Sequence, residues 1–381
     1  MKKILFVSTR YPFSNIYSGD RVRSSSIIKF ISKNNKVDLI CSDDEKNKNI
    51  KAEKIFVNHN LFIRIFNVFI SVLKLKPLQN GFFFNEELKQ YINNNHQNYE
   101  TIIFHLIRSA QYLPASFKGN KILEMTDLYS NNYNQTSKNL SIFNPMFYIY
   151  FLEEILVKKY EKECSNRFDK IILVSKKDLK NKDKFFKKNF IEIPNGIKKQ
   201  SNVFKFLKKN KKILFIGNIK YLPNKLACYE FAQKILPKIN IKFKNIEFHI
   251  VGDIYNKDKF YLNKIKNVKV IGKKNNLHSI IKNSFCGISN LKIATGFQNK
   301  ILTYMVHGLP SIVSKKSFSK SSILKKNHDL FIYNDNNELI KYILKLKTNK
   351  IISKKISQNA YLKSRKYYNW NKVLKKYNKI I

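Results

Sequence analysis

The alternation of short apolar runs with longer amphipathic stretches is the feature that most constrains how this chain folds. Such runs predict buried strands of parallel sheets joined by helices. In the first series we predict strands at residues 4–8, 36–41, 102–104, 121–124 and 170–174 and a helix at 21–32. In the second we predict strands at residues 213–216, 246–251, 269–271, 286–289 and 311–313 and helices at 225–239, 277–283 and 300–306. The pattern therefore predicts an α/β chain with two parallel sheets.

The chain length supports a division into two domains. A single hydrophobic core rarely grows beyond about 250–300 residues, and this chain has 381. The polar, basic stretch at residues 200–212 is typical of a linker. We therefore predict an N-terminal domain over residues 1–198 and a second domain over 199–365. A last helix over 366–381, which carries the only tryptophan, is expected to pack back toward the first domain.

The formal net charge is +47, from 73 Lys and Arg against 26 Asp and Glu. An excess of this size favours anionic partners such as nucleic acid, an anionic membrane surface or phosphorylated substrates. Lys supplies most of it and is spread along the chain beside Asn and Ile, which is also typical of compositional drift toward A/T-rich codons. Nucleic-acid binding would require clustered Arg with interleaved aromatic residues. Because the Arg residues cluster only at Arg21 and Arg23, the sequence disfavours a nucleic-acid partner.

Cysteine and histidine spacing argues against a metal site. The four cysteines lie far apart without a CxxC pair, and the histidines show no ligand spacing. We therefore expect no metal, no disulfide framework and a reducing, cytoplasmic compartment. Arg64 and Lys74 interrupt the most apolar stretch, residues 61–75, so we expect no membrane-spanning helix. The sequence also lacks the motifs of serine hydrolases, P-loop ATPases, zincins and dinucleotide oxidoreductases.

The strongest local motif lies at residues 295–310, where a glycine-containing turn leads into a predicted helix. A helix start presents free backbone N–H groups that bind an anion such as a diphosphate. The candidate ligands there are Gly296, Phe297, Gln298, Asn299, Lys300 and Thr303, with Lys292 as a further cation. The alternative is an ordinary strand–turn–helix unit with solvated lysines.

A second glycine turn follows the predicted strand at residues 213–216. Gly217 permits close approach of a ligand to the backbone. Asn218 and Lys220 follow it in the loop where a phosphate or nucleotide would bind. The alternative is a tight turn without a ligand.

The loop before the predicted helix at residues 21–32 combines Gly19, Arg21 and Arg23. Arginines at a helix start suit phosphate or acidic ligands. The alternative places both arginines on the helix surface, with Asp20 as the capping residue.

Two more candidates follow predicted strands. Asp127 comes after the strand at residues 121–124 and can orient a sugar hydroxyl or act as a base. The alternative for Asp127 is a helix cap. His105 directly follows the strand at residues 102–104 and can line the same site, although a lone histidine is more often structural. Ligand sites of open α/β sheets lie at such strand ends.

Taken together, these segments resemble family 4 retaining glycosyltransferases, most closely the branch that includes sugar transferases of exopolysaccharide clusters. The resemblance runs in order along nearly the whole chain. It rests on residues 3–7, 18–23, 108–113, 124–130, 168–175, 193–196, 215–224, 250–252, 271–272, 296–310 and 368–370.

The resemblance implies a GT-B fold of two Rossmann-like domains facing a central cleft. A nucleotide-diphosphate-sugar donor would bind the C-terminal half and the acceptor the N-terminal half, without a metal. The leaving phosphate would help to deprotonate the acceptor hydroxyl, and Lys292 and Lys300 would stabilise its charge. The acceptor would be a glycan or a lipid-linked sugar of polysaccharide or lipopolysaccharide biosynthesis. The implied sites are catalytic Asp127, Lys300 and Lys292; donor-binding Gly217, Asn218, Lys220, Gly296, Phe297, Gln298, Asn299, Lys300 and Thr303; and acceptor-binding Gly19, Arg21, Arg23 and His105.

The chain departs from the family pattern at four positions. Thr295 and Thr303 stand where the family has paired glutamates, Asn218 stands where a cation is common, and Thr126 stands where many relatives have histidine. These changes motivate a second hypothesis, a catalytically weakened GT-B protein that acts as a binding partner or scaffold. A nucleotide-sugar epimerase of similar architecture fits the ordered motifs less well.

Residues 61–75 and 142–156 are apolar and rich in aromatic residues. With a basic surface, they predict contact with the inner face of an anionic membrane. The alternative makes them core helices, and the pattern of residues 142–156 slightly favours that alternative.

Overall fold

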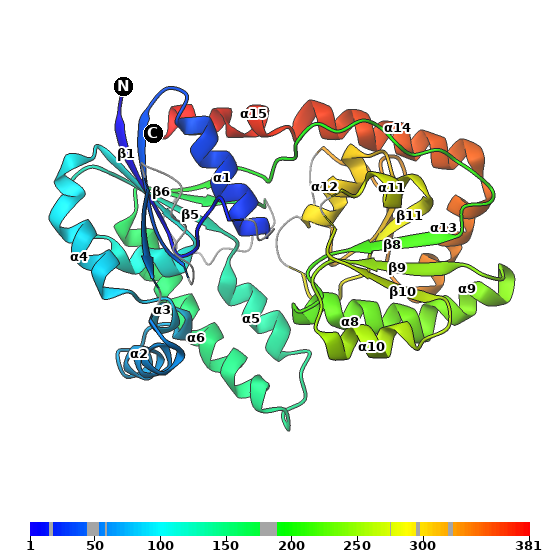
Figure 1. Cartoon of the computed structure of the whole chain (residues 1–381), viewed down its shortest axis with the longest axis horizontal. Coiled ribbons are helices and arrows are strands. Elements are labelled where there is room, and N and C mark those ends of the chain that lie inside the picture. Colours follow the sequence, from blue (N-terminus) through cyan, green and yellow to red (C-terminus); the bar gives the residue numbers. More distant parts are fainter. Residues whose placement is uncertain are drawn as a thin grey trace. The chain divides into compact units, whose positions relative to one another are not determined.

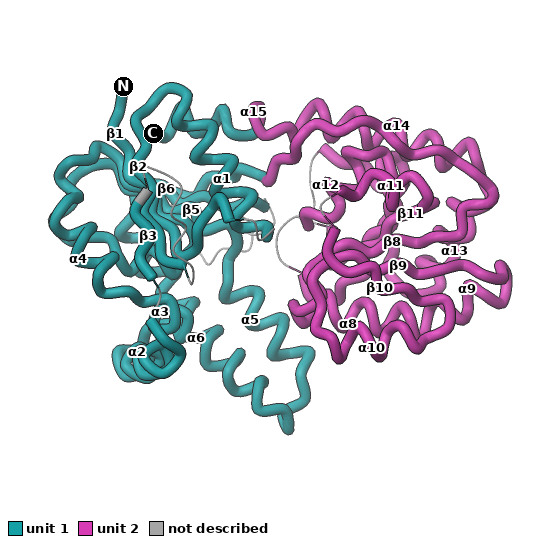
Figure 2. The backbone as a smooth tube through the Cα atoms, in the orientation of Figure 1, with its two compact units in different colours: residues 1–194, 373–381 teal, residues 195–372 magenta. Residues whose placement is uncertain are grey.

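The computed structural model describes residues 1–14, 18–43, 53–57, 59–175, 189–274, 276–294, 298–318 and 323–381. It contains two compact units (Figure 2): unit 1 comprises Met1–Pro194 with Val373–Ile381, and unit 2 comprises Asn195–Lys372. The division lies close to the domain boundary predicted after residue 198. The predicted last helix is shared between the units, because its final residues belong to unit 1.

Unit 1 is built on a seven-stranded parallel sheet with the strand order β3-β2-β1-β4-β5-β6-β7 (Figure 1). Its strands are β1 (Lys3–Ser8), β2 (Lys36–Asp43), β3 (Glu53–Val57), β4 (Thr101–His105), β5 (Asn120–Thr126), β6 (Lys170–Leu173) and β7 (Phe190–Glu192). The apolar side chains of the central strands are fully buried, as the continuous apolar runs predicted. The sequence pattern missed β3 and β7 because both are short edge strands that are only partly buried.

Helices connect the strands of unit 1. They are α1 (Gly19–Ile31), α2 (Leu61–Leu73), α3 (Leu78–Phe82), α4 (Glu86–Asn95), η1 (His96–Asn98), η2 (Ile107–Tyr112), α5 (Tyr129–Ser137), α6 (Pro145–Arg167) and η4 (Leu374–Lys379). The last of them, η4, comes from the chain's C-terminus and contacts α1. Unit 1 is therefore completed by residues from both ends of the chain.

Unit 2 has a six-stranded parallel sheet with the order β10-β9-β8-β11-β12-β13 (Figure 1). Its strands are β8 (Lys212–Ile216), β9 (Glu247–Val251), β10 (Val268–Gly272), β11 (Ser284–Ser289), β12 (Ser311–Ser314) and β13 (Phe331–Tyr333). The five predicted strands of this half are confirmed. The sixth, β13, has only three residues and lies at the sheet edge.

The helices of unit 2 are α8 (Leu222–Glu230), η3 (Phe231–Ile235), α9 (Leu236–Lys242), α10 (Asn256–Asn263), α11 (His278–Lys282), α12 (Asn299–Val306), α13 (Asn336–Thr348) and α14 (Lys350–Tyr367). The short helix α15 (Trp370–Val373) follows. Near it the two chain segments that connect the units run together, because the Ile197 N–H donates to the Tyr368 carbonyl at 2.6 Å. A Cβ on Gly196 would collide with the Trp370 ring, so this contact requires glycine.

Glycines at the ends of neighbouring strands bring two loops of unit 2 into contact. The Gly217 N–H donates to the Val251 carbonyl at 2.9 Å. The next residue along β9, Gly252, has a φ of +146°. A Cβ on Gly252 would lie 1.7 Å from the Gly217 carbonyl oxygen. The backbone after β8 can therefore take its position only because residue 252 has no side chain.

We predict that Gly252→Ala destabilises unit 2 more than Gly272→Ala. Both positions have positive φ, which costs about 1–3 kcal/mol for a side chain, but a Cβ on Gly272 would meet open space. Gly252→Ala adds a steric overlap, which typically costs a further 1–3 kcal/mol or more, roughly. Urea denaturation measures both free energies of unfolding. Equal losses in the two variants would contradict the close approach of residues 217 and 252.

Candidate functional site

Both sheets change their direction of winding at one central pair of strands. In unit 1 these strands are β1 and β4, and in unit 2 they are β8 and β11. Ligands of open α/β sheets bind beyond the carboxyl ends of such a pair, where the following loops diverge. Candidate residues were therefore sought at these two strand ends, one in each unit.

In unit 2, the loop after β8 and the first turn of α12 meet at one amide. The Lys300 Nζ donates to the Asn224 Oδ1 at 2.7 Å, and the Asn224 Nδ2 donates to the Asn218 carbonyl at 2.8 Å. Asn224 also borders Gly217, since a Cβ there would lie 3.1 Å from its Nδ2. Two motifs that lie far apart in the sequence are thus brought together around Lys300, Asn218 and Gly217.

The ammonium group of Lys300 is buried. It lies 3.8 Å from the centroid of the Phe215 ring, and the whole residue is 7% exposed. Burial lowers the pKa of Lys300 to about 7, because the charged form loses its hydration. Near neutral pH this lysine is poised to take up a proton when an anion binds beside it. A buried amine with this property is a candidate for function as well as for packing.

The N-terminus of α12 follows residues 295–297. The predicted ligands Gly296 and Phe297, together with Thr295, lie outside the described residues. Gln298 precedes the first helical residue in extended conformation, and the Asn299 Oδ1 accepts a hydrogen bond from Asn195 at 2.9 Å. The Thr303 hydroxyl donates to the Asn299 carbonyl at 3.1 Å. The donor-binding roles of these residues stay predictions.

The two other predicted lysines are paired with carboxylates. Lys220 lies 3.0 Å from Asp253, and Lys292 lies 2.8 Å from Glu230. The Lys292 side chain is 66% exposed, so this pair contributes little to stability. Neither lysine shares the Asn224 contact that positions Lys300, and their predicted roles stay untested.

In unit 1, Arg23 belongs to a buried network. Its Nε donates to the Glu124 carboxylate at 2.8 Å, its Nη2 to the Ile193 carbonyl at 2.9 Å and its Nη1 to the Pro194 carbonyl at 3.2 Å. The side chains of Arg23 and Glu124 are 2% and 0% exposed, and the Tyr377 hydroxyl also donates to Glu124. This geometry gives Arg23 a structural role and does not support the acceptor contact predicted for it.

Arg21 is held in a similar way. Its Nη2 lies 2.9 Å from Asp43, and its Nε donates to the Tyr11 carbonyl at 3.1 Å. Gly19 is the first residue of α1, two positions earlier. Arg21 therefore joins the loop after β1 to the end of β2, and its predicted acceptor contact likewise lacks support from the geometry.

His105 and Asp127 lie at the carboxyl ends of adjacent strands, β4 and β5. Within the described ranges, the His105 Nε2, the Asp127 Oδ1 and the Nη2 of nearby Arg108 are buried without a hydrogen-bond partner. Buried polar atoms are almost always paired with protein, water or a ligand. Leu106 and Thr126 beside them have φ values of 69° and 72°, and such strain often accompanies function. These three unsatisfied groups form the candidate site of unit 1.

Burial sets the charge of these groups. It raises the pKa of Asp127 to about 6, while Arg23 opposes and Glu124 reinforces this rise. Burial also lowers the pKa of His105 to about 3 and that of Arg108 to about 10. At neutral pH, Asp127 is therefore largely ionised, His105 is neutral and Arg108 is charged. The site offers an acceptor, a neutral imidazole and a donor within reach of a polar ligand.

Sequence reasoning missed three residues of these sites. Asn224 and Arg108 appeared only as parts of longer segments, and the burial that gives them their partners was not visible in the sequence. Tyr304, on α12, was not considered, although its hydroxyl donates to the Leu214 and Ile288 carbonyls at 3.1 Å and accepts from the Ile216 N–H at 3.0 Å. Tyr304 thereby ties α12 to β8 and β11, which fixes Lys300 in place.

Neither a metal site nor a membrane span emerges from the described ranges. Among those residues, no three His, Cys, Asp or Glu side chains gather as metal ligands would. In the same part of the chain, no helix is both long and apolar enough to cross a membrane. The four cysteines are buried and form no disulfide.

The region around Lys300 matches a known family. Residues 210–349, which lie within unit 2, match the family model described as glycosyl transferases group 1. No curated protein sequence matches the chain.

Solved structures show the fold of the whole chain. TarM, solved from S. aureus with α-GlcNAc-glycerol and UDP in a mutant form, has a TM-score of 0.71 at 13% identity over 100% of this chain and 98% of its own. Sucrose-phosphate synthase from Thermosynechococcus elongatus has a TM-score of 0.75 at 12% identity over 100% and 98%. Anabaena Alr3699/HepE in complex with UDP has a TM-score of 0.68 at 14% identity over 99% and 98%. The predicted GT-B fold of two Rossmann-like domains is therefore confirmed.

We predict that Arg23→Met lowers the free energy of unfolding of unit 1 by about 3–5 kcal/mol, because it leaves the Glu124 carboxylate buried without its cation. Arg23→Met combined with Glu124→Met should recover part of this loss. Arg10→Met is the matched control, since Arg10 pairs with Asp20 in a partly exposed position worth about 0–1 kcal/mol. Thermal and urea denaturation report the differences. An Arg23 variant as stable as the control would return Arg23 to the list of candidate ligands.

Proposed function

We propose that this chain is a glycosyltransferase that moves a sugar from a nucleotide-diphosphate-sugar donor to an acceptor hydroxyl. The observation that carries the proposal is the convergence of Lys300, Asn224 and Gly217 at the carboxyl end of β8, inside the stretch that matches group 1 glycosyl transferases. HepE, whose fold is similar, was solved with UDP and with UDP-glucose, which supports a nucleotide sugar as the donor.

Unit 2 would bind the donor. Free N–H groups at the start of α12 and the positive end of its dipole favour a diphosphate. Lys300, in the first turn of that helix, would contribute charge once the diphosphate has raised its pKa. Gly217 and Asn218 would line the same site from the loop after β8. No metal is expected to take part, because these groups can stabilise the leaving diphosphate themselves.

Unit 1 would bind the acceptor. The unsatisfied atoms of His105, Arg108 and Asp127 offer both hydrogen-bond donors and acceptors, as sugar hydroxyls require. Ionised Asp127 would orient the attacking hydroxyl or accept its proton. In a retaining reaction, which the family resemblance suggests, the new bond forms on the face that the diphosphate leaves. The departing diphosphate oxygen would then take the hydroxyl proton.

We propose a hexosyltransferase of cell-surface polysaccharide or lipopolysaccharide assembly that acts on a glycan or lipid-linked acceptor in the cytoplasm. Four buried, unpaired cysteines are consistent with a reducing compartment. The second candidate function is a weakened GT-B protein that serves as a binding partner. The observation that favours it is Thr303, whose hydroxyl is already bonded to its own helix and carries no charge for a ribose.

The first prediction separates these two functions. Purified protein is incubated with UDP-, GDP- and dTDP-sugars, and both thermal shift and release of the free nucleoside diphosphate are measured. An enzyme should be stabilised by one nucleotide class and should release that diphosphate through slow donor hydrolysis. Stabilisation without turnover, also in the presence of glycan acceptors, would favour the binding protein. The absence of both effects for every donor would contradict the proposed function.

We predict that Lys300→Met weakens binding of the preferred nucleotide sugar about tenfold or more and removes its pH dependence. In the wild type, Lys300 has a pKa of about 7, and only its protonated form attracts the diphosphate. Affinity should therefore fall as the pH rises above about 7, by at most about tenfold per unit. Calorimetry between about pH 6.5 and 8.5 in buffers of different ionisation enthalpy measures affinity and proton uptake.

The control for this variant is Lys341→Met, on the exposed surface of α13. A nucleotide sugar is the right ligand because its diphosphate has no terminal phosphate that titrates in this range. If Lys300→Met changed only the melting temperature and kept the affinity and pH profile of the wild type, Lys300 would be a packing residue.

We predict that Asp127→Asn reduces sugar transfer about 100-fold, the lower end of the range for a positioned acid–base group, while donor affinity stays unchanged. Because the pKa of Asp127 is about 6, wild-type activity should rise with pH through that value as the carboxylate ionises. Steady-state rates across this range test both points. Asp169→Asn, whose side chain is 50% exposed, is the control. A full rate in Asp127→Asn would exclude Asp127 from the reaction.

A further inference from the structure

Helix α2 is apolar on nearly all sides and has no buried residue. Its exposed large side chains include Phe62, which is 80% exposed. The others are Leu61, Ile63, Ile65, Phe66, Phe69 and Leu73. A helix in a water-soluble core hides an apolar stripe and shows water a polar face. Since α2 does neither, its apolar surface must be covered by something outside this unit.

A second exposed apolar segment lies at the start of α6. Phe143, in the turn before this helix, is 89% exposed. Its exposed neighbours are Ile142, Met146, Tyr148, Ile149, Phe151, Leu152 and Ile155. The slight preference for a core helix at residues 142–156 was therefore wrong. The buried stripe of α6 begins only at Glu153 and runs toward its C-terminus, so the first turns of the helix extend beyond the core.

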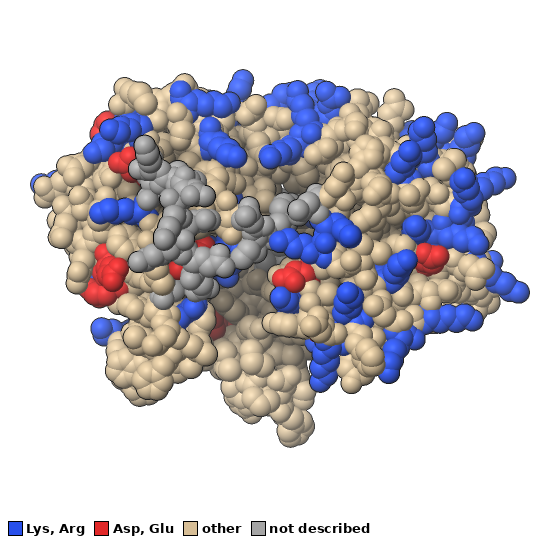
Figure 3. Space-filling model, in the orientation of Figure 1, with Lys and Arg blue, Asp and Glu red and all other residues tan. Residues whose placement is uncertain are grey.

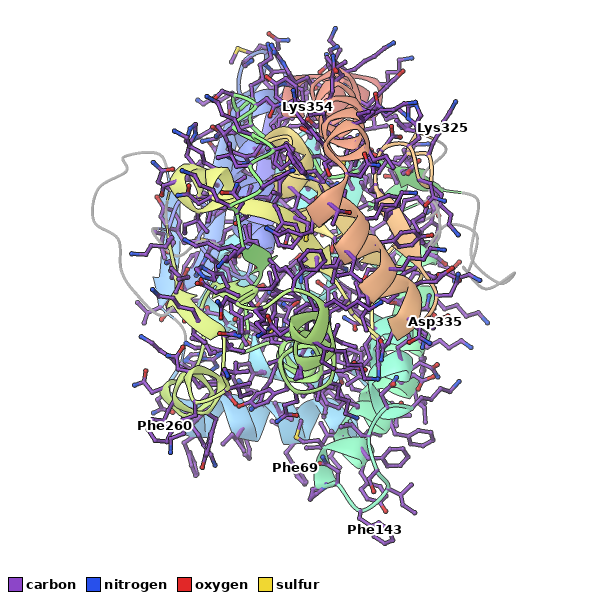
Figure 4. All side chains as sticks on the ribbon, turned by 90° about the vertical axis from the view of Figure 1, so that its right-hand side faces the viewer. Phe69, Phe143, Phe260, Lys325, Asp335 and Lys354 are labelled. Carbon is purple, nitrogen blue, oxygen red and sulfur yellow. The ribbon has the colours of Figure 1, made fainter. Side chains whose placement is uncertain are left out.

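Both segments belong to one surface of unit 1, which we call the apolar face. The chain just after α2 is held on α6, because the Leu78 and Gln79 N–H groups donate to Glu153 at 2.6 and 3.3 Å and Lys76 pairs with Glu163. Phe69 and Phe143 lie at the same end of this unit and point away from its body (Figure 4). In the space-filling view, the protrusions over α2 and the α5–α6 turn are almost free of charged side chains (Figure 3).

The charges around the apolar face are basic or already neutralised. The one charged residue of α2, Arg64, has its guanidinium 3.8 Å from the centroid of the Phe82 ring and donates to the Phe82 carbonyl. Glu153 and Glu163 are occupied by the contacts described above. Basic residues border the face at Lys74, Lys76, Lys158, Lys159 and Lys162. An apolar centre with a basic border complements an anionic lipid surface, where apolar side chains enter the interface and lysines meet headgroups.

We propose that the apolar face of unit 1 inserts into the interface of a membrane that contains anionic lipid. The surface consists of a helix and a helical turn that project outward, a shape that a bilayer accepts. The position of the aromatic rings fits the headgroup region, which favours them. The inference is independent of the proposed sugar transfer, because it rests on exposure and charge in α2 and α6 alone. It would place unit 1 directly against lipid.

The test uses the full-length protein and vesicles of phosphatidylcholine with or without phosphatidylglycerol, in low and high salt. We expect co-sedimentation with the anionic vesicles, which salt weakens but does not abolish, because burial of the apolar side chains is not screened. Phe62→Ser/Phe66→Ser/Phe69→Ser should reduce partitioning at least tenfold. Phe143→Ser/Ile149→Ser should reduce it independently. The matched control, Ile241→Ser/Phe260→Ser/Ile351→Ser, removes exposed apolar side chains of unit 2 and should bind as the wild type does.

Three outcomes would overturn the proposal. The first is a wild-type protein that binds neither vesicle. The second is a loss of binding in the control equal to that in the α2 variant. The third is a wild type that self-associates in light scattering without binding vesicles and becomes monomeric in the α2 variant, because the cover would then be a second copy. Circular dichroism and thermal melting establish that each variant is folded, and the α6 variant provides a second measurement if the α2 variant is not.

Discussion

The buried ion pair between Arg23 and Glu124 holds unit 1 together. One guanidinium joins helix α1, strand β5 and the carbonyls of Ile193 and Pro194, where the chain leaves the unit. A buried pair of this kind is costly unless its remaining hydrogen-bonding capacity is satisfied, and Tyr377 supplies a further partner. The first helix, the central sheet and both ends of the unit thus share one electrostatic centre.

The same pair influences the chemistry proposed for Asp127. That carboxyl lies three residues beyond Glu124 and is buried, with one oxygen left without a partner in the described part of the chain. Arg23 favours its ionised form and Glu124 opposes it. A residue that contacts no substrate can therefore set the protonation of one that does. In unit 2 the corresponding centre is Lys300, where Tyr304 and Asn224 fix a buried amine in place of a salt bridge.

The sequence was informative where burial is continuous and uninformative where tertiary contacts decide. Apolar runs located the central strands, but the partly exposed edge strands β3, β7 and β13 carry no such signal. Glycine turns and a helix start pointed to Gly217 and Lys300, which the fold brings together. No local pattern could show that Arg23 faces Glu124, 101 residues away, or that the aromatic start of α6 extends beyond the core. Exposure of an apolar helix depends on what packs beside it, and periodicity does not report that.

The return of Val373–Ile381 to unit 1 has a consequence for biosynthesis. A ribosome makes the chain from its N-terminus, so the whole of unit 2 emerges before the segment that completes unit 1. Until Tyr377 appears, Glu124 lacks one of its partners in a site closed to water. The first half of the nascent protein must therefore wait, partly assembled, for the final residues, and a ribosome that stops early would leave both halves translated but only the second finished.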